Sequence, residues 1–180
     1  GDGYPSGLAV VGDVHALETL PDASLDGLLS FNVLAYLTDA EEAIFYQQAA
    51  RIVKPGGCLV VTHSNELFDM FSLNRYTVEF FRQHLVSSPD YAERLHTLLV
   101  NADAAPTNPL YNVRENPLAY RYKLAGYGFN EMKQAFINRH DAPPALLQGK
   151  AYPDTLGLPE SEHWKLMFTC STYGSLSVRM

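Results

Sequence analysis

The chain has 180 residues, of which 47% are hydrophobic and 18% are charged, as expected for a globular domain with a substantial core and not for a disordered chain. The formal net charge of −7 argues against a nucleic-acid partner, because Lys and Arg contacts to phosphates supply most of that affinity. No apolar run reaches the ~20 residues of a membrane helix and no segment resembles a signal peptide, so we expect a cytoplasmic protein without a membrane partner.

Two short apolar runs in the first third of the chain predict buried strands. The first covers Leu8 to Val11, and Asp13 follows it closely. The second covers Leu25 to Phe31, and Asn32 interrupts it. Apolar runs without polar alternation are typical of strands that are buried on both faces of a parallel sheet.

A helix is predicted after the second strand. Thr38 is a suitable N-cap, and Glu41 three residues later completes a capping box. The helix then runs from Asp39 to about Val53, with an apolar face, acidic residues in its first turn and basic residues at its end.

The stretch KPGG, from Lys54 to Gly57, predicts a turn between this helix and a third strand. Its proline blocks the helix, and its two glycines allow positive φ. The strand covers Cys58 to Thr62. Ligands of open α/β sheets bind outside the carboxyl ends of the strands, so we expect a site at the residues that follow, His63, Ser64, Asn65 and Glu66.

Helices are predicted to dominate residues 65–105. Glu66 to Phe81 is rich in aromatic residues and predicts one or two amphipathic helices, and Tyr91 to Val100 predicts another. We interpret residues 65–105 as a helical insert that either packs against the sheet or caps a substrate. Ala104 to Asn116 contains two prolines and is expected to form a loop.

Residues 1–64 and 106–180 are assigned to one α/β core. Pro117 to Ala125 predicts a helix with proline in its first turn. Asn130 to Asn138 and Trp164 to Tyr173 predict the last two strands.

The two cysteines, Cys58 and Cys170, both lie in predicted strands. We expect them to be buried, reduced thiols. The six histidines are scattered without the spacing of zinc ligands, so no metal site is predicted.

Four segments together resemble one family. The family is that of the class I S-adenosylmethionine (SAM) dependent methyltransferases. Gly12 to Leu17 (GDVHAL) resembles the family's acidic motif after the third strand. Leu20 to Leu37 resembles the fourth strand with its loop, and Arg51 to Val61 (RIVKPGGCLVV) resembles the entry into the fifth strand. Leu124 to Phe129 (LAGYGF) resembles the end of the family's last helix. The resemblance is good over Leu8 to Ser64 and weaker near the C-terminus.

The resemblance implies a fold and a cofactor. The fold is a Rossmann-like, doubly wound α/β sheet that is mainly parallel, with an antiparallel last strand inserted between the fifth and sixth strands. Cys58 and Cys170 would then lie on adjacent strands. The cofactor is SAM, and the implied activity is methyl transfer to a small-molecule acceptor, with a sugar, glycan or other secondary metabolite as our choice.

The resemblance also implies cofactor-binding residues. Asp13 would accept a hydrogen bond from the adenine amino group, and the backbone N–H of Val14 would meet an adenine ring nitrogen. The side of the cofactor that carries ribose and methionine would be lined by Phe31, Asn32 and Val33. Asp13 could instead simply form a turn at the strand end.

Candidates for acceptor chemistry follow from their expected place at strand ends and in the aromatic insert. A general base would help if the acceptor is a hydroxyl, and the candidates are His63, Glu66 and His140. The candidate substrate-binding residues are Tyr36, Asn65, Tyr76 and Tyr122. Each of these residues has an alternative interpretation as a surface or packing residue.

Two features of the family are missing from the sequence. There is no acidic-x-Gly-x-Gly-x-Gly turn after a first strand, and no acidic residue after a second strand that would bind the ribose; Gly1-Asp2-Gly3 is too short to count as that turn. We therefore expect a domain without its first two strands, as in an N-terminally truncated protein. The alternative is a sheet in which the third strand pairs directly with the fourth.

Two competing functions remain open. A nicotinamide-dependent dehydrogenase shares the doubly wound sheet but would show G-x-G-x-x-G after its first strand. A non-catalytic α/β scaffold or partner subunit that has lost cofactor binding is favoured by the missing glycine turn.

Overall fold

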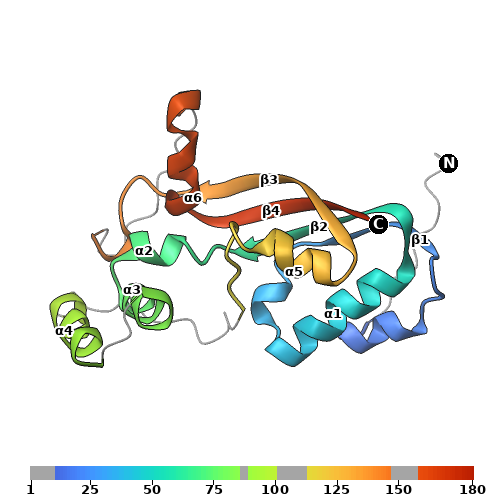
Figure 1. Cartoon of the computed structure of the whole chain (residues 1–180), viewed down its shortest axis with the longest axis horizontal. Helices are drawn as coiled ribbons and strands as arrows, with labels where there is room; N and C mark the ends of the chain where they lie inside the picture. Colours follow the sequence, from blue (N-terminus) through green and yellow to red (C-terminus); the bar gives the residue numbers. More distant parts are fainter. Residues whose placement is uncertain (1–10, 86–88, 101–112, 147–157) are drawn as a thin grey trace.

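The computed structural model describes residues 11–85, 89–100, 113–146 and 158–180 of the chain (Figure 1). The predicted first strand lies outside these residues except for Val11, which is exposed and not in a strand. Gly1-Asp2-Gly3 and most of the predicted loop from Ala104 to Asn116 also lie outside them. How residues 1–10 pair therefore stays a prediction.

The described residues form a four-stranded sheet in the order β1-β2-β4-β3 (Figure 1). The strands are β1 (Leu25–Ser30), β2 (Val53–Ser64), β3 (Phe129–Arg139) and β4 (Cys170–Arg179). β1 and β2 are parallel, whereas β4 is antiparallel to both β2 and β3. This arrangement confirms the predicted α/β class and the antiparallel last strand inserted between two parallel ones.

Helix α1 (Asp39–Ile52) confirms the predicted helix and its cap. The Thr38 side chain accepts a hydrogen bond from the backbone N of Glu41, and the Glu41 carboxylate accepts one from the backbone N of Thr38 at 2.7 Å. At the other end of the helix, Arg51 donates to Asp22 at 2.6 Å and to the carbonyl of Leu20 at 2.7 Å. These contacts fix the loop before β1 against the helix.

The KPGG turn is an outward bulge within β2. Leu25 pairs with Val53 and Gly27 pairs with Cys58. An advance of two residues along β1 therefore corresponds to an advance of five residues along β2. Gly56 has φ of +80°, a conformation that glycine adopts without a steric penalty.

One face of the sheet carries the hydrophobic core. Helices α1 and α5 (Tyr120–Gly126) lie against this face (Figure 1). The hydroxyls of the buried Tyr46 and Tyr120 are 2.9 Å apart, which satisfies both groups. The other fully buried large side chains include Leu34, Ile52, Val53, Leu59, Val61, Leu124, Phe129 and Tyr173.

The opposite face of the sheet is more open. Leu29 is paired with Val60, which is paired with Leu176, so the three side chains form a row across the sheet. Leu29 is 62% exposed and Leu176 is 37% exposed. The expectation that the strands are buried on both faces is therefore wrong for the described part of the chain, because its helices α1 and α5 cover only one face.

The predicted helices after β2 are present. They are α2 (Phe68–Ser72), α3 (Arg75–Phe80), the π-helical turn η3 (Phe81–Leu85) and α4 (Pro89–Val100). They lie beyond the carboxyl end of β2, away from α1 (Figure 1). Whether they close over a substrate stays a prediction. Short 3-10 helices elsewhere are η1 (Val14–Thr19), η2 (Leu34–Tyr36), η4 (Pro144–Leu146) and η5 (Glu160–Lys165).

The predicted bounds of the last strand are wrong. Residues 160–169 form η5 and α6 (Leu166–Thr169), and the strand begins only at Cys170. Glu160 and Glu162 in the first turn favour a helix here, and Lys165 pairs with Glu162 at 2.7 Å. β4 continues through Gly and Ser because it is hydrogen-bonded on both sides, to β2 and to β3.

Two smaller predictions are refined. Pro117 to Ala119 form a turn, so α5 begins at Tyr120. Cys58 and Cys170 are free thiols on adjacent strands, but Cys58 is paired with Val178 near the far end of β4. No helix in the described ranges is long and apolar enough to cross a membrane.

Candidate functional site

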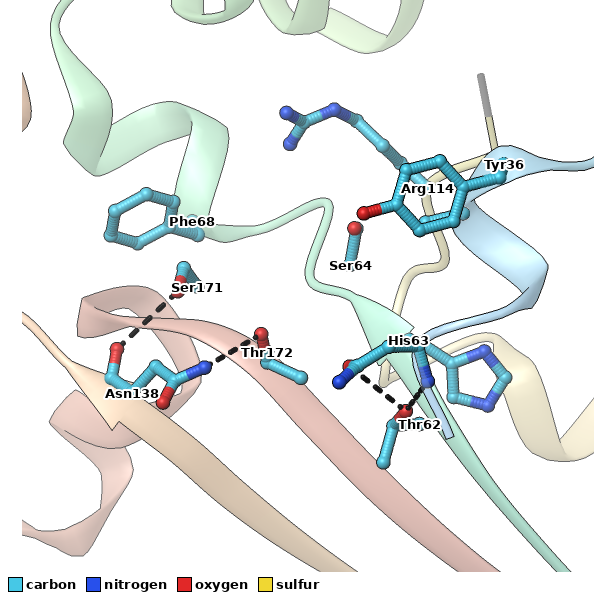
Figure 2. Close-up of a pocket in the computed structure, with 11 residues that line it drawn as sticks. Tyr36, Thr62, His63, Ser64, Phe68, Arg114, Asn138, Ser171 and Thr172 are labelled. Carbon is cyan, nitrogen blue, oxygen red and sulfur yellow. Dashed lines mark hydrogen bonds between the residues drawn. The ribbon is translucent and has the colours of Figure 1, made fainter. Parts of the chain in front are cut away.

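A cavity of about 430 Å³ opens at the carboxyl ends of β1 and β2 (Figure 2). This is where an open α/β sheet binds its ligands. Its lining comes from both strand ends, from η2 and α2, from the segment before α5, and from the ends of β3 and β4: Asn32, Ala35, Tyr36, Thr62, His63, Ser64, Phe68, Arg114, Asn138, Ser171 and Thr172.

Asn32 fixes the end of β1 to β2 at the cavity. Its backbone N donates to Thr62 Oγ1 at 2.8 Å. Its φ of +55° is a left-handed conformation that asparagine tolerates better than most residues. The chain turns sharply at this point, and Asn32 lines the cavity; its predicted contact with the cofactor stays a prediction.

Two aromatic side chains form walls of the cavity. Figure 2 shows Tyr36 and Phe68 on opposite sides of Ser64. Tyr36 is 46% exposed, which contradicts the alternative interpretation that it packs in the core. Phe68 is buried. The cavity therefore combines apolar walls with polar groups, which is the usual composition of a small-molecule site.

Arg114 stands between this cavity and a second one of about 250 Å³. Its guanidinium forms an ion pair with Asp69 and lies over the Tyr76 ring at 4.1 Å. Burial raises the pKa of Asp69 to about 7, although the charge of Arg114 acts in the opposite direction. The second cavity is otherwise lined by Glu66, Asp69, Tyr76, Glu79, Phe80 and Gln83.

A network of charges holds the Arg114 segment against the sheet. The backbone N of Glu115 donates to the carbonyl of Ser64 at 3.0 Å, and the backbone N of Glu66 donates to the carbonyl of Glu115 at 3.1 Å. Lys123 on α5 binds Glu115 at 2.5 Å and Glu42 on α1 at 2.7 Å. The position of Arg114 is thus tied to two helices and to the end of β2.

His63 lies at the end of β2 among the residues that line the cavity, but its ring is buried, and this position does not support its prediction as a general base. The ring packs in the core, 4.3 Å from the Tyr120 ring and 4.9 Å from the Tyr173 ring, with Nε2 3.4 Å from Ser175 Oγ. Burial lowers the pKa of His63 to about 3, so its imidazole is neutral at physiological pH. Side chains alternate along a strand, and this one faces the core side of β2.

The other two candidate bases are not brought together with it. Glu66 lines the second cavity and pairs with His84 at 2.9 Å. His140 is buried, and its ring lies 4.6 Å from the Phe68 ring. His140 thus supports a cavity wall from behind, and a catalytic role for Glu66 stays a prediction.

Asn65 is a structural residue, so its prediction as a substrate ligand is wrong. It is fully buried, and its Nδ2 donates to the carbonyls of Met167 and Cys170, each at 2.8 Å. Its Oδ1 accepts from the backbone N of Leu67 at 3.1 Å. Its amide nitrogen thus joins the end of β2 to α6 and β4, and its amide oxygen holds the turn that leads into α2.

Tyr76 and Tyr122 lie in different places. Tyr76 lines the second cavity beneath Arg114. Tyr122 on α5 is 67% exposed, and its hydroxyl accepts a hydrogen bond from Arg121 Nη2 at 2.8 Å. It is therefore not part of either cavity, and its prediction as a substrate ligand is not supported by its position.

The predicted cofactor residues fit parts of SAM by chemical type. Asp13 Oδ1 accepts from the backbone N of His15 at 2.9 Å and caps η1, and the carboxylate remains exposed. Phe31 and Val33 are 54% and 43% exposed, which leaves apolar surface at the end of β1 for a ring. The side chain of Val14 is buried in the core.

Several lining residues were missed by the sequence analysis. Arg114, Asn138 and Thr172 come from segments far along the chain, and no motif marks them. Asn138 has φ of +57°, and its Nδ2 donates to Thr172 Oγ1 at 3.3 Å. In the described ranges, no cluster of three His, Cys, Asp or Glu side chains could hold a metal ion.

The described residues form an α/β domain with a cavity at the carboxyl ends of two parallel strands. Residues 3–61 match the family model described as a methyltransferase domain. No curated protein matches the sequence. The fold is similar to that of a SAM-dependent methyltransferase from Archaeoglobus fulgidus, with a TM-score of 0.53 and 16% identity over 94% of this chain and 66% of that chain.

Two further solved structures are less similar. One is from Haloferax volcanii, a complex between the Trm112 methyltransferase activator and a methyltransferase, with a TM-score of 0.49 and 17% identity over 94% of this chain and 60% of that chain. The other is an S-adenosylmethionine dependent methyltransferase from Mesorhizobium loti, with a TM-score of 0.47 and 14% identity over 89% of this chain and 64% of that chain. The chain thus spans less than two thirds of the length of these structures.

Residues 3–61 thus match a methyltransferase-domain model, and the described residues share the fold of a SAM-dependent methyltransferase. The similar structure from Archaeoglobus fulgidus is that of an enzyme that depends on S-adenosyl-L-methionine.

Proposed function

We propose that the protein transfers a methyl group from SAM to a small-molecule acceptor held in the cavity at the ends of β1 and β2. The observation that carries this proposal is the position and lining of that cavity. It lies at the carboxyl ends of two parallel strands of a methyltransferase fold, and it joins the walls of Tyr36 and Phe68 to a group of hydroxyl and amide side chains.

Asp13, Phe31 and Asn32 are the residues we assign to the cofactor. When bound, SAM supplies an electrophilic methyl group on a sulfonium. The exposed Asp13 carboxylate can accept a hydrogen bond from the adenine amino group, and Phe31 offers an apolar surface to the ring. Asn32 follows Phe31 in the chain and is part of the cavity lining.

The chemical work we assign to the acceptor cavity is positioning. Among the described residues that line it there is no carboxylate, and burial holds the pKa of His63 to about 3. Methyl transfer is an in-line displacement, so holding the acceptor in the attacking orientation supplies much of the acceleration. The hydroxyls of Ser64 and Thr172 favour a polar acceptor, such as a sugar or another hydroxylated metabolite.

The test is an assay of S-adenosylhomocysteine release from SAM with a panel of hydroxylated small molecules. We expect release that depends on the acceptor and falls by at least about tenfold in Tyr36→Ala, the scale of one lost positioning contact. Tyr122→Ala is the matched control, since Tyr122 lies on α5 outside both cavities. Equal rates in Tyr36→Ala and wild type would overturn the assignment of the cavity.

A non-catalytic role is the other outcome. Binding of S-adenosylhomocysteine without turnover of any acceptor would favour a scaffold or partner subunit over an enzyme.

A further inference from the structure

We propose that the acceptor carries an oxyanion, a carboxylate or a phosphate, which Arg114 binds where the two cavities meet. This inference rests on the proposed function of the first cavity and names the class of molecule that it takes.

The first observation is the charge of the cavity. Arg114 is the only charged side chain among the described residues that line it, since burial keeps His63 neutral. The other polar lining groups are the hydroxyls and amides of Asn32, Tyr36, Thr62, Ser64, Asn138, Ser171 and Thr172. A cavity with neutral donors and one cation at its edge attracts an anion that bears further polar groups.

The second observation is the donor count at Arg114. A guanidinium has five N–H donors in a planar fork, and the ion pair with Asp69 uses Nη1. Within the described part of the chain, Nε is buried and has no hydrogen-bond partner, so the guanidinium keeps an unsatisfied donor. Tyr76 covers one face of the guanidinium at 4.1 Å. Planar oxyanions bind to the edges of a guanidinium through paired, charge-assisted hydrogen bonds.

The third observation is that Arg114 is held in place before any ligand arrives. Its neighbour Glu115 is joined to Lys123 and, through it, to Glu42, and its backbone is hydrogen-bonded to Ser64 and Glu66. The Arg114 side chain is itself only 22% exposed. A donor that is already ordered loses little conformational freedom on binding, which favours its use as a ligand anchor.

A cationic acceptor is less consistent with the second cavity, although that cavity contains three carboxylates. Each of them has a partner within the chain: Glu66 pairs with His84, Asp69 with Arg114, and Glu79 with Arg82. All three are therefore already engaged within the chain, and Asp69 is the one of them that pairs with Arg114 and would compete with an incoming anion.

The test is calorimetric titration of the full chain with matched anionic and neutral probes. The pairs are glucuronate with glucose and 4-hydroxybenzoate with 4-hydroxybenzamide, and glucose 6-phosphate is the phosphate arm. We expect at least one anion to bind at least about tenfold more tightly than its neutral counterpart, as a charge-assisted pair to arginine should. Tighter binding of the carboxylates or of glucose 6-phosphate shows which of the two oxyanions the site prefers. No preference for any anion, or no binding of any of them, would overturn the inference.

Variants connect that preference to Arg114. Arg114→Gln should abolish it, and Arg75→Gln is the matched control, because Arg75 also lies over the Tyr76 ring, at 5.2 Å, but lines neither cavity. Asp69→Asn should tighten anion binding several-fold, since it removes a competing carboxylate. If Arg114→Gln does not fold, the double variant Arg114→Gln with Asp69→Asn removes both charges and should still lose the preference. A preference that persists in these Arg114 variants would refute the inference.

The same samples separate this inference from the proposed function. Anion binding that depends on Arg114 but occurs without methyl transfer would support the inference while the proposed function fails. Turnover of neutral acceptors at the same rate as anionic ones would support the proposed function and overturn the inference.

Discussion

Asn65 gives the sharpest test of how the site is built. Substitution by alanine removes three hydrogen bonds and leaves the carbonyls of Met167 and Cys170 and the N–H of Leu67 without their partner. Each buried group left unsatisfied costs about 1–3 kcal/mol, and water can reach the partly buried Met167 contact, so we expect Asn65→Ala to lower the free energy of unfolding by about 3–5 kcal/mol. That is a large part of the ~5–15 kcal/mol that stabilises a domain.

The assay is urea unfolding followed by far-ultraviolet circular dichroism, with the m-value checked for two-state behaviour. Asn65→Asp should cost at least as much at neutral pH, because it places a carboxylate oxygen against two carbonyl oxygens. Asn130→Ala is the control, since Asn130 is exposed and its change should stay within about 0.5 kcal/mol. A loss below about 1 kcal/mol for Asn65→Ala would refute the structural role and return Asn65 to the candidate substrate ligands.

Three further predictions concern charged residues. Asp13→Ala should weaken S-adenosylhomocysteine binding by about 1–3 kcal/mol, measured by calorimetry, and an unchanged affinity in the folded variant would remove Asp13 from the cofactor site. Burial raises the pKa of Asp69 from 3.8 to about 7, so the folded state holds a proton that the unfolded state has lost, and stability should fall as pH rises through this window. Asp69→Asn should flatten that part of the pH profile in urea unfolding, and an identical profile would contradict the cause. Lys123→Met leaves Glu42 and Glu115 buried without their cation and should cost about 3–5 kcal/mol in the same assay, whereas a neutral effect would show that the network does not hold the Arg114 segment.

Features encoded over a few neighbouring residues were predicted well from the sequence. The Thr38 and Glu41 capping box and α1 depend on contacts within one or two turns of chain. The KPGG stretch was predicted as a turn before a strand at Cys58, but it is a bulge inside β2, because Val53 already pairs with Leu25 of β1. The position of the last strand between β2 and β3 came from the resemblance to methyltransferases rather than from local pattern. Its start at Cys170 was missed, because pairing on both sides decides which residues of that segment are extended.

The side of the sheet toward which each side chain points was predicted less well. His63 and Ser64 are neighbours at the end of β2 and both contribute to the cavity lining, but the His63 ring packs against core aromatic rings. A shift of one residue reverses such an assignment, and an apolar run without alternation does not fix it. Arg114 lies fifty residues after Ser64 in the chain. Backbone hydrogen bonds hold its segment at the site, and no local sequence motif predicts them.

Calorimetric titration of this chain with S-adenosylhomocysteine tests whether the domain binds the cofactor. We predict saturable binding at one site per chain, weakened by Asp13→Ala and unaffected by Tyr122→Ala. An absence of binding at millimolar ligand, with the protein folded by circular dichroism, would contradict the assignment of the cofactor to Asp13, Phe31 and Asn32 in this chain.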